Sequence, residues 1–261
     1  MKITEKNATG SVNDLKIENL SNDTIIVICG DVIKGGQQDR IIEDDIVLAP
    51  KSGKVNLKVF CVESGRWTRV DRSEVVADSR ISPARVSNDA VSNEAAEFKT
   101  YYSKGAMSLR KVVEKEKDQG QVWSKVDEIN LKNKTQTATA AYTAISTSDT
   151  FIIKLNGYLK FFEKKLTNLN IIGVIAVTGN KVIGCDLFAT NAIFRGQYPS
   201  LLHSYATEAI LNGAPVNIST AAVKRYSDQL FKNETTQKQM LKQKGNAFIR
   251  NGKKLRVSCF D

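Results

Sequence analysis

Histidine is almost absent from this chain of 261 residues, which contains only His203. A single histidine excludes metal centres built from several histidines, including those typical of cupin-like proteins rich in strands. It also restricts nucleophilic catalysis, because neighbours on a helix project about 100° apart and a Ser-His-Asp arrangement using adjacent His203 and Ser204 has poor geometry. Carboxylates such as Glu63, Asp186 and Glu208 could hold a hard cation, but no pair of them has a diagnostic spacing. We therefore predict no metal site.

Long hydrophobic runs are missing as well. No stretch approaches ~20 uninterrupted apolar residues, so we expect no membrane association through a spanning helix. Residues 1–11 are polar and lack the hydrophobic core of a signal peptide, and we expect a cytoplasmic protein, with an export signal removed from the chain as the alternative. The four cysteines lie far apart without Cys-x-x-Cys spacing. The sequence predicts buried free thiols at Cys29, Cys61, Cys185 and Cys259.

The formal net charge of +10 is concentrated in the C-terminal part of the chain. Residues 1–150 contain 22 Lys and Arg and 22 Asp and Glu, whereas residues 151–261 contain 16 and 6. This excess indicates either a solvated basic face or a surface that attracts a phosphate-bearing ligand, a nucleic acid or an acidic partner. Aromatic residues make up only 7% of the chain, and no RNA-recognition signature or zinc finger is present. We therefore do not expect nucleic acid, and attraction of an anionic small molecule stays the functional interpretation of this charge.

A carboxylate falls in the buried phase of a predicted strand. Apolar side chains recur at every second position and share one face, and Glu63 continues their phase. The apolar positions are Val55, Leu57, Val59 and Cys61. A buried carboxylate is tolerated only when it is paired or hydrogen-bonded, and the candidate partners are Arg66, just beyond Gly65, and Arg40. Glu63 is interpreted either as part of a structural ion pair or as a ligand-orienting or acid-base group, and it is our candidate catalytic residue.

An upstream hairpin is predicted to bring further polar residues to Glu63. Gly35 and Gly36 allow a tight turn between two apolar runs. Gln38 and Arg40 follow this turn, where they either satisfy the turn backbone or present an amide and a forked cation to a carboxylate or phosphate. Trp67 is interpreted either as a packing residue or as a stacking platform.

The same residues resemble the signature of a bacterial family, the ARG and rhodanese-phosphatase-superfamily-associated proteins, where ARG denotes ADP-ribosylglycohydrolase. The resemblance spans most of the chain and is weaker over residues 254–261, where an expected histidine is absent. It is carried by Gly30, Gly35, Gly36, Gln38, Arg40, Cys61, Glu63, Gly65, Arg66 and Trp67, then by residues 121–123, 172–188 and 201–206. The family name records a genomic association and establishes no activity or cofactor.

The resemblance implies an uncharacterised protein that binds or processes a phosphate-containing small molecule linked to NAD or ADP-ribose metabolism. The ligand-binding candidates are Gln38, Arg40, Arg66, Trp67, Asp186, Ser204 and Tyr205. Asp186 is also interpreted as a helix cap. Ser204 shares a helix face with Glu208, and this pair is interpreted either as solvated or as part of the same cleft. The alternative function is a non-catalytic interaction module that uses the basic C-terminal surface for a protein or nucleic-acid partner.

The sequence predicts an α+β fold, with an N-terminal antiparallel β-layer, central helices and a C-terminal β-hairpin packed with helices. We expect one interlocked domain over residues 1–261. The alternative is a division into 1–134 and 151–261, with the Thr-, Ala- and Ser-rich residues 135–150 as linker. Strands are predicted over residues 13–75, with an exposed-looking turn at residues 43–45, and an extended loop over residues 71–93.

Helices are predicted over residues 93–117 and 120–133, from residue 151 onward, and over about 219–232. Between them, Gly179 and Asn180 form a two-residue hairpin signal. Its first strand, residues 171–177, is apolar on both faces and is predicted to be central in a covered sheet. Pro199 is placed in the first turn of a helix that ends near Asn212. A last pair of strands closes the chain.

Overall fold

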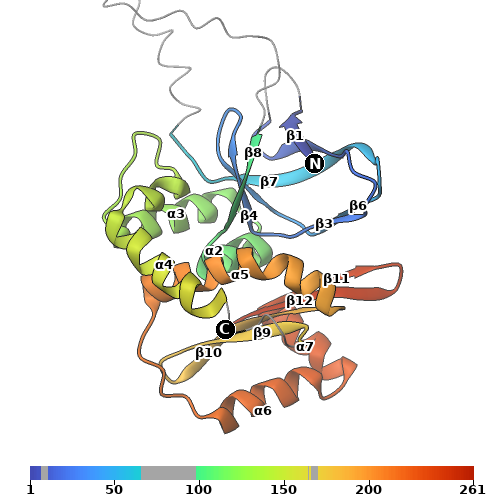
Figure 1. The fold of residues 1–261 in the computed structure, drawn as a ribbon, viewed down its shortest axis with the longest axis vertical. Helices are drawn as coiled ribbons and strands as arrows, with labels where there is room; N and C mark the ends of the chain where they lie inside the picture. The colour runs from blue at the N-terminus through green and yellow to red at the C-terminus, as the bar shows by residue number, and fades with distance from the viewer. Residues whose placement is uncertain (7–10, 66–97, 164, 166–169) are drawn as a thin grey trace, which may run out of the picture.

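The computed structural model describes residues 1–6, 11–65, 98–163, 165 and 170–261 of the chain (Figure 1). The loop predicted over residues 71–93 lies outside these residues, as do Arg66 and Trp67. Within them the fold is mixed α+β, with antiparallel strands first, helices in the middle and strands with helices at the end. This order confirms the predicted fold class.

Antiparallel strands form the N-terminal sheet in the order β1-β2-β7-β5-β4-β8. Their bounds are β1 Lys2–Glu5, β2 Asp14–Asn19, β4 Asp31–Gly35, β5 Arg40–Ile42, β7 Gly53–Cys61 and β8 Phe98–Lys104. A separate pair, β3 Ile25–Val27 and β6 Ile46–Leu48, packs on one face of this sheet through a cluster that includes Leu57 and Val59 of β7. Phe60 and Val62 pack into a different cluster with the helices. The alternation predicted for β7 is therefore confirmed.

The helix predicted over residues 93–117 is wrong in its first part, because residues 98–104 form strand β8. Its backbone pairs with β4, so that Lys104 lies opposite Asp31. The sequence of β8 is rich in aromatic residues and threonine, which favour strands when a partner edge is available. The helix begins only at α2 (Met107–Lys111), which continues as the π-helical turn η1 (Val112–Glu116).

A layer of helices lies between the two sheets, with α2 and α5 at its centre (Figure 1). Its other members are α3 (Gln119–Asn133), the 3-10 helix η2 (Tyr142–Thr147) and α4 (Asp149–Glu163). Buried side chains of these helices share one core with the N-terminal sheet, including Leu109, Val126, Tyr142 and Ala206. The segment predicted as a linker thus contains η2 and a buried tyrosine. The division into one or two domains stays a prediction.

Helix α5 runs from Asn191 to Asn212, with Pro199 in its interior. The predicted start at Pro199 is therefore wrong. Thr190 caps the helix instead, because its side-chain oxygen accepts a hydrogen bond from the backbone N–H of Ile193. Proline in a helix interior removes one backbone hydrogen bond, so the tertiary packing of this helix overrides the local signal.

The C-terminal sheet has the order β11-β12-β10-β9. Its strands are β9 Gly173–Thr178, β10 Lys181–Phe188, β11 Gly245–Arg250 and β12 Lys253–Phe260, and helices α6 (Thr220–Phe231) and α7 (Glu234–Lys244) accompany them. The hairpin at Gly179 is confirmed, but β9 is an edge strand and the predicted central position is wrong. Val174 and Ile175 pack into different clusters, so both faces of β9 are covered although one edge is free of a described strand.

None of the helices in the described residues combines the length and the apolar character needed to cross a membrane. All four cysteines are buried and free, as predicted.

Candidate functional site

Gln38 and Arg40, predicted to lie near Glu63, do so in a group that we call the hairpin cluster. Its members are Gln38, Asp39, Arg40 and Glu63, which are buried, and Thr139 and Thr143, which are half-buried. Strands β5 and β7 pair with Arg40 opposite Cys61, two residues before Glu63. The Glu63 carboxylate accepts hydrogen bonds from the backbone N–H of Asp39 at 2.9 Å and from the Thr139 hydroxyl at 2.7 Å. Glu63 is 2% exposed and Arg40 is fully buried. The burial of Glu63 follows the phase read from the sequence.

The turn between β4 and β5 is shaped by its glycines and by Asp39. Gly35 and Gly36 have φ angles of +119° and +58°, in the region that favours glycine. The Asp39 carboxylate accepts hydrogen bonds from the Gly35 N–H at 3.1 Å and from the Thr143 hydroxyl at 2.8 Å. Gln38 is thereby turned inward, and its Nε2 donates to the Glu63 carbonyl at 3.1 Å.

A segment that we call the closing segment, residues 137–143, covers the hairpin cluster. Glu63 and Ala141 form an isolated antiparallel bridge, and Tyr142 N–H donates to the Val62 carbonyl at 2.8 Å. Ala140 has a φ angle of +49°, which a residue with a side chain rarely adopts. The hairpin cluster is therefore closed by backbone pairing on this side. Arg66 and Trp67, predicted for the same place, lie outside the described residues.

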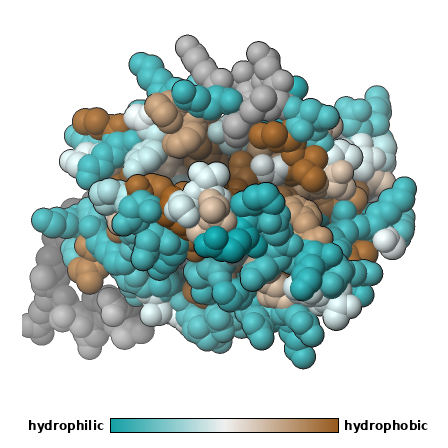
Figure 2. Space-filling view, turned by 90° about the horizontal axis from the view of Figure 1, so that it is seen from below, coloured by the Kyte–Doolittle hydropathy of each residue, from teal (hydrophilic) through white to brown (hydrophobic). Residues whose placement is uncertain are grey.

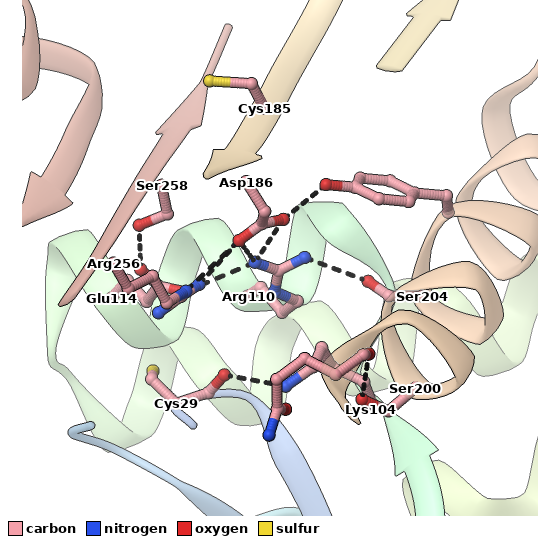
Figure 3. A network of polar contacts seen from close by, with 12 residues as sticks. Cys29, Lys104, Arg110, Glu114, Cys185, Asp186, Ser200, Ser204, Arg256 and Ser258 are labelled. Carbon is pink, nitrogen blue, oxygen red and sulfur yellow. Dashed lines mark hydrogen bonds and ion pairs between the residues drawn. The ribbon is translucent and has the colours of Figure 1, made fainter. Parts of the chain in front are cut away.

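The other predicted site residues, Asp186, Ser204 and Tyr205, lie in a second group that we call the arginine network. Figure 3 shows Asp186 and Ser204 beside Arg110. Its remaining members are Arg110, Glu114, Arg256, Ser258 and Asp45. Arg110 Nη2 donates to both carboxylate oxygens of Asp186, at 2.7 and 2.9 Å. Arg256 donates to Asp186 through Nε at 3.3 Å and Nη2 at 2.9 Å. Asp186 therefore joins two arginines, and the alternative that it caps a helix is wrong.

The arginine network connects the helical layer with both sheets. Arg256 of β12 contacts Glu114 of η1 at 2.9 Å and Asp45, between β5 and β6, at 3.0 Å. Ser204 of α5 donates to the Gly105 carbonyl at 2.7 Å, and Tyr205 donates to Asp186. The network thus joins segments that are far apart in the sequence.

Local sequence explains how these charges reach the interior. Arg110 and Glu114 are four residues apart and share one face of the α2–η1 helix. Gly30, with a φ angle of +87°, lies where a Cβ atom would approach the Arg110 Cγ to 2.8 Å. Asp186 alternates with Cys185 on β10, so the two side chains point to opposite faces, as Figure 3 shows.

The charges of the arginine network reinforce one another. Burial raises the pKa of the Asp186 carboxyl, but the attraction of Arg110 and Arg256 outweighs burial and holds that pKa below its ordinary value. Burial lowers the pKa of Arg110, whereas Asp186 and Glu114 raise it above its usual range. Burial, followed by the Asp186 charge, raises the pKa of Tyr205. The arginines are thus charged partners of an ionised Asp186.

Two predictions of solvent exposure are wrong, one for the turn that contains Asp45 and one for the pair Ser204 and Glu208. Asp45 belongs to the turn predicted as exposed, yet its side chain is 4% exposed and binds Arg256. Ser204 and Glu208 are both buried, so the solvated interpretation of this pair is wrong. The Glu208 carboxylate accepts a hydrogen bond from the Ser108 N–H at 2.8 Å and so caps the start of α2.

Sequence reasoning missed Arg110, Glu114 and Arg256. The sequence did contain a signal for the first two. Arg110 and Glu114 are four residues apart and each follows an apolar residue, Leu109 or Val113, of the predicted helix. Arg256 gave no such signal within its basic neighbourhood. As ligand-binding residues, Asp186, Ser204 and Tyr205 stay a prediction. The structure shows their side chains bonded within the arginine network.

Surface hollows occur elsewhere in the described part of the protein. One of about 310 Å³ lies at the α6–α7 corner and is lined by Leu230, Phe231, Asn233, Glu234, Gln237 and Lys254. A neighbouring one of about 160 Å³ shares Phe231, Gln237 and Lys254 with it. Figure 2 shows the face seen from below, where brown apolar patches are interrupted by hydrophilic side chains. Neither hollow includes a residue of the hairpin cluster.

Among the described residues, no group of three or more His, Cys, Asp or Glu is arranged to hold a metal ion. The family model described as ARG and Rhodanese-Phosphatase-superfamily-associated Protein domain matches residues 1–258, which includes most of the segment where the expected histidine is absent. No curated protein matches the chain, and no solved structure does.

Proposed function

Because this chain belongs to the ARG and Rhodanese-Phosphatase-superfamily-associated Protein family, we propose that it binds a phosphate-containing small molecule of the ADP-ribose type at the hairpin cluster. In this proposal Arg40 binds a phosphate group, and Gln38 and Glu63 accept hydrogen bonds from ribose hydroxyls. The family name supports the ADP-ribose class, and the chemistry of the hairpin cluster supports a ligand that has both a phosphate and hydroxyl groups.

The observation that carries the proposal is the Gln38 side chain. It is 1% exposed, and its Oε1 atom has no hydrogen-bond partner among the described residues. Its orientation is fixed, because Nε2 donates to the Glu63 carbonyl and a carbonyl can only accept. An unsatisfied buried acceptor costs about 1–3 kcal/mol, so native proteins rarely keep one without a role. A ligand hydroxyl would satisfy it.

Glu63 is suited to hold a hydroxyl in the same place. Its carboxylate oxygens accept hydrogen bonds from the Asp39 N–H and from the Thr139 hydroxyl, so the group is already oriented as an acceptor. Carboxylates are the usual partners of ribose hydroxyls in nucleotide sites. A catalytic role for Glu63, as an acid-base group acting on such a hydroxyl, remains part of the proposal.

Arg40 supplies the cation that a phosphate requires. A guanidinium is planar, always charged and matched in shape to phosphate oxygens, so arginine is favoured where phosphate is recognised away from water. Its place at the start of β5, opposite Cys61, fixes its backbone beside Glu63. The cation and the acceptors are thus held close together by the turn before β5, by β5 itself and by the residues that follow β7.

Entry of a ligand requires movement of the closing segment. Thr139 and Tyr142 of the closing segment hydrogen-bond to Glu63 and Val62, just after β7. Gln38, Arg40 and Glu63 are all buried beneath this segment. Binding should therefore be slower than diffusion and should protect the closing segment from proteolysis.

The test is a thermal-shift screen with ADP-ribose, NAD, AMP and inorganic phosphate. A ligand present at 100 times its dissociation constant adds about 2.7 kcal/mol to the free energy of unfolding. Gln38→Leu should abolish the shift caused by the ligand, whereas Gln37→Leu, in the same turn, should retain it. No shift with any of the four compounds, or equal shifts in both variants, would contradict the proposal.

The alternative interaction module depends on the basic C-terminal part. Several exposed lysines there form ion pairs along or beside their helices: Lys224 with Asp228, Lys238 with Glu234, and Lys244 with Asp261. Paired lysines attract a polyanion less strongly than free ones. We therefore favour the small-molecule proposal.

A further inference from the structure

Two cysteines face each other across the C-terminal sheet. The register of β10 and β12 places Cys185 directly opposite Cys259. Hydrogen bonds fix this register on both sides, from Asp261 N–H to the Ile183 carbonyl at 3.0 Å and from Ala189 N–H to the Leu255 carbonyl at 2.9 Å. Both cysteines are fully buried. Their juxtaposition is therefore a fixed feature of the sheet.

The spacing of such a pair fits a covalent bond between the sulfurs. Directly opposite residues of antiparallel strands have Cα atoms about 4.5–5.5 Å apart. Disulfides span Cα separations of roughly 4.4–6.8 Å. The two thiols are already close enough to hydrogen-bond with each other. The other cysteines lie in the N-terminal part, Cys29 in the turn between β3 and β4 and Cys61 at the end of β7.

Neighbouring elements of the C-terminal part enclose the pair closely. Gly245 of β11 lies on the other side of Cys259, where a Cβ atom would come within 3.1 Å of the Cys259 sulfur. The Tyr226 hydroxyl of α6 lies 3.9 Å from the Cys185 sulfur. Tyr226 is half-buried. Oxidation of this buried pair therefore requires a small oxidant and a local opening of the region around Tyr226.

We propose that Cys185 and Cys259 are a redox-active pair that forms a reversible disulfide, with hydrogen peroxide as the oxidant. The Cys259 thiolate attacks one peroxide oxygen, the O–O bond breaks, and the departing hydroxide takes a proton to leave as water. Cys185 then attacks the sulfur of the resulting sulfenic acid. The S–S bond forms, and the sulfenic hydroxyl leaves with the Cys185 proton as a second water. Two thiols are oxidised and one peroxide is reduced.

The electrostatics agree with this division of roles. The hydrogen bond with Cys185 lowers the pKa of Cys259, although burial opposes this effect. The same hydrogen bond, followed by burial, raises the pKa of Cys185. Because the thiolate is the nucleophile, Cys259 is the thiol that reacts first. For Cys29, burial and the charges of Glu114 and Asp45 raise the pKa, so it should stay unreactive.

The position of the disulfide gives it a consequence for the arginine network. Asp186 follows Cys185 on β10, and Arg256 lies three residues before Cys259 on β12. Figure 3 shows that Cys185 points away from the network while Asp186 points into it. The disulfide would thus bond the two strands that hold these charges without replacing any network contact. It should raise the unfolding temperature of the oxidised protein.

The experiment treats the full chain with hydrogen peroxide under native conditions, blocks the remaining thiols with iodoacetamide, and maps the peptides by mass. We expect a peptide linked through Cys185 and Cys259, lighter by two hydrogens than the sum of its parts, which dithiothreitol separates. Cys29→Ser, the matched control, should give the same linked peptide. Cys185→Ser should leave a sulfenic acid at Cys259 that dimedone traps, and Cys259→Ser should leave Cys185 reduced.

Three results would overturn the proposal. One is that both thiols stay reduced in native protein while peroxide oxidises exposed methionines. Another is that the link forms only after the chain is unfolded in urea, since then the sheet does not supply the pairing. The third is a link between other cysteines. The mapping of the unsubstituted chain decides the question even if a serine variant fails to fold.

Discussion

Replacing Asp186 by asparagine should destabilise the protein more than any change of a surface carboxylate. Asparagine has nearly the same volume, so the substitution removes a charge and one acceptor oxygen with little change in packing. Arg110 and Arg256 make four contacts of 2.7–3.3 Å with the two carboxylate oxygens. After the substitution, the two guanidinium groups remain buried, with Glu114 and Asp45 as their remaining anionic partners.

The expected size follows from the cost of an uncompensated buried charge. Breaking a buried ion pair by removing one partner costs about 3–5 kcal/mol. Total stabilities of domains are about 5–15 kcal/mol, so the loss is a large share of the whole. For a chain of this size, 1 kcal/mol corresponds to about 2–4 °C, which predicts a fall in Tm of roughly 6–20 °C.

The assay is urea unfolding followed by circular dichroism and by tryptophan fluorescence, since coincident transitions are needed to justify a two-state free energy. Asp228→Asn is the matched control. Asp228 pairs with Lys224 on α6, and both side chains are more than half exposed. An exposed pair contributes about 0–1 kcal/mol, so the control should lie close to the unsubstituted protein.

The same charge gives a dependence on pH. The pKa of Asp186 is lower in the fold than in the unfolded chain, so its contribution is present above about pH 4 and is lost as the pH falls toward the folded value. The gap between Asp186→Asn and the unsubstituted protein should shrink below about pH 4. A loss under about 1 kcal/mol at pH 7, or a gap that does not change with pH, would refute the account of the arginine network.

Further measurements address the other charged and polar groups. Glu63→Gln should cost about 1–3 kcal/mol or abolish the ligand-induced shift, whereas Glu116→Gln, on an exposed side chain, should change neither; equal effects would make Glu63 an ordinary carboxylate. Burial lowers the pKa of His203, so stability should fall as the pH drops below about 6.5, and His203→Gln should flatten that slope. An unchanged slope would exclude His203 as its source. Charge reversal of Lys238, Lys242 and Lys244 on α7 should leave small-molecule binding intact. We also expect no salt-sensitive DNA or RNA binding; in such binding, the logarithm of the affinity would fall with the logarithm of the salt concentration, with a slope near −0.9 per phosphate contact.

The local sequence pattern predicted the structure correctly where a single local constraint, such as strand alternation or a glycine turn, determines it. The alternation of Val55, Leu57 and Val59 placed Glu63 in a buried position, because a period of two assigns every side chain to a face. The glycines of the β4–β5 turn and of the β9–β10 hairpin marked their turns, because only glycine adopts a positive φ at little cost. The order of strands and helices, and with it the fold class, followed from the same signals.

The sequence alone misplaced elements whose state depends on a distant partner. Strand β8 forms because the edge of β4 is available to it, and α5 continues through Pro199 because its flanks are packed. The position of β9 at a sheet edge is likewise a matter of strand order, which an apolar run does not encode. Propensity acts over a few residues, so it yields to contacts made across the fold.

Only the tertiary structure decided which charges meet. Arg110, Asp186 and Arg256 are separated by 76 and 70 residues along the chain and come from a helix and two strands. Asp45 and Glu208 looked solvated in their local sequence and are buried because other elements cover them. A buried charge is stable only with its partner, and that partner is chosen by packing across the whole fold, which no short stretch of sequence specifies.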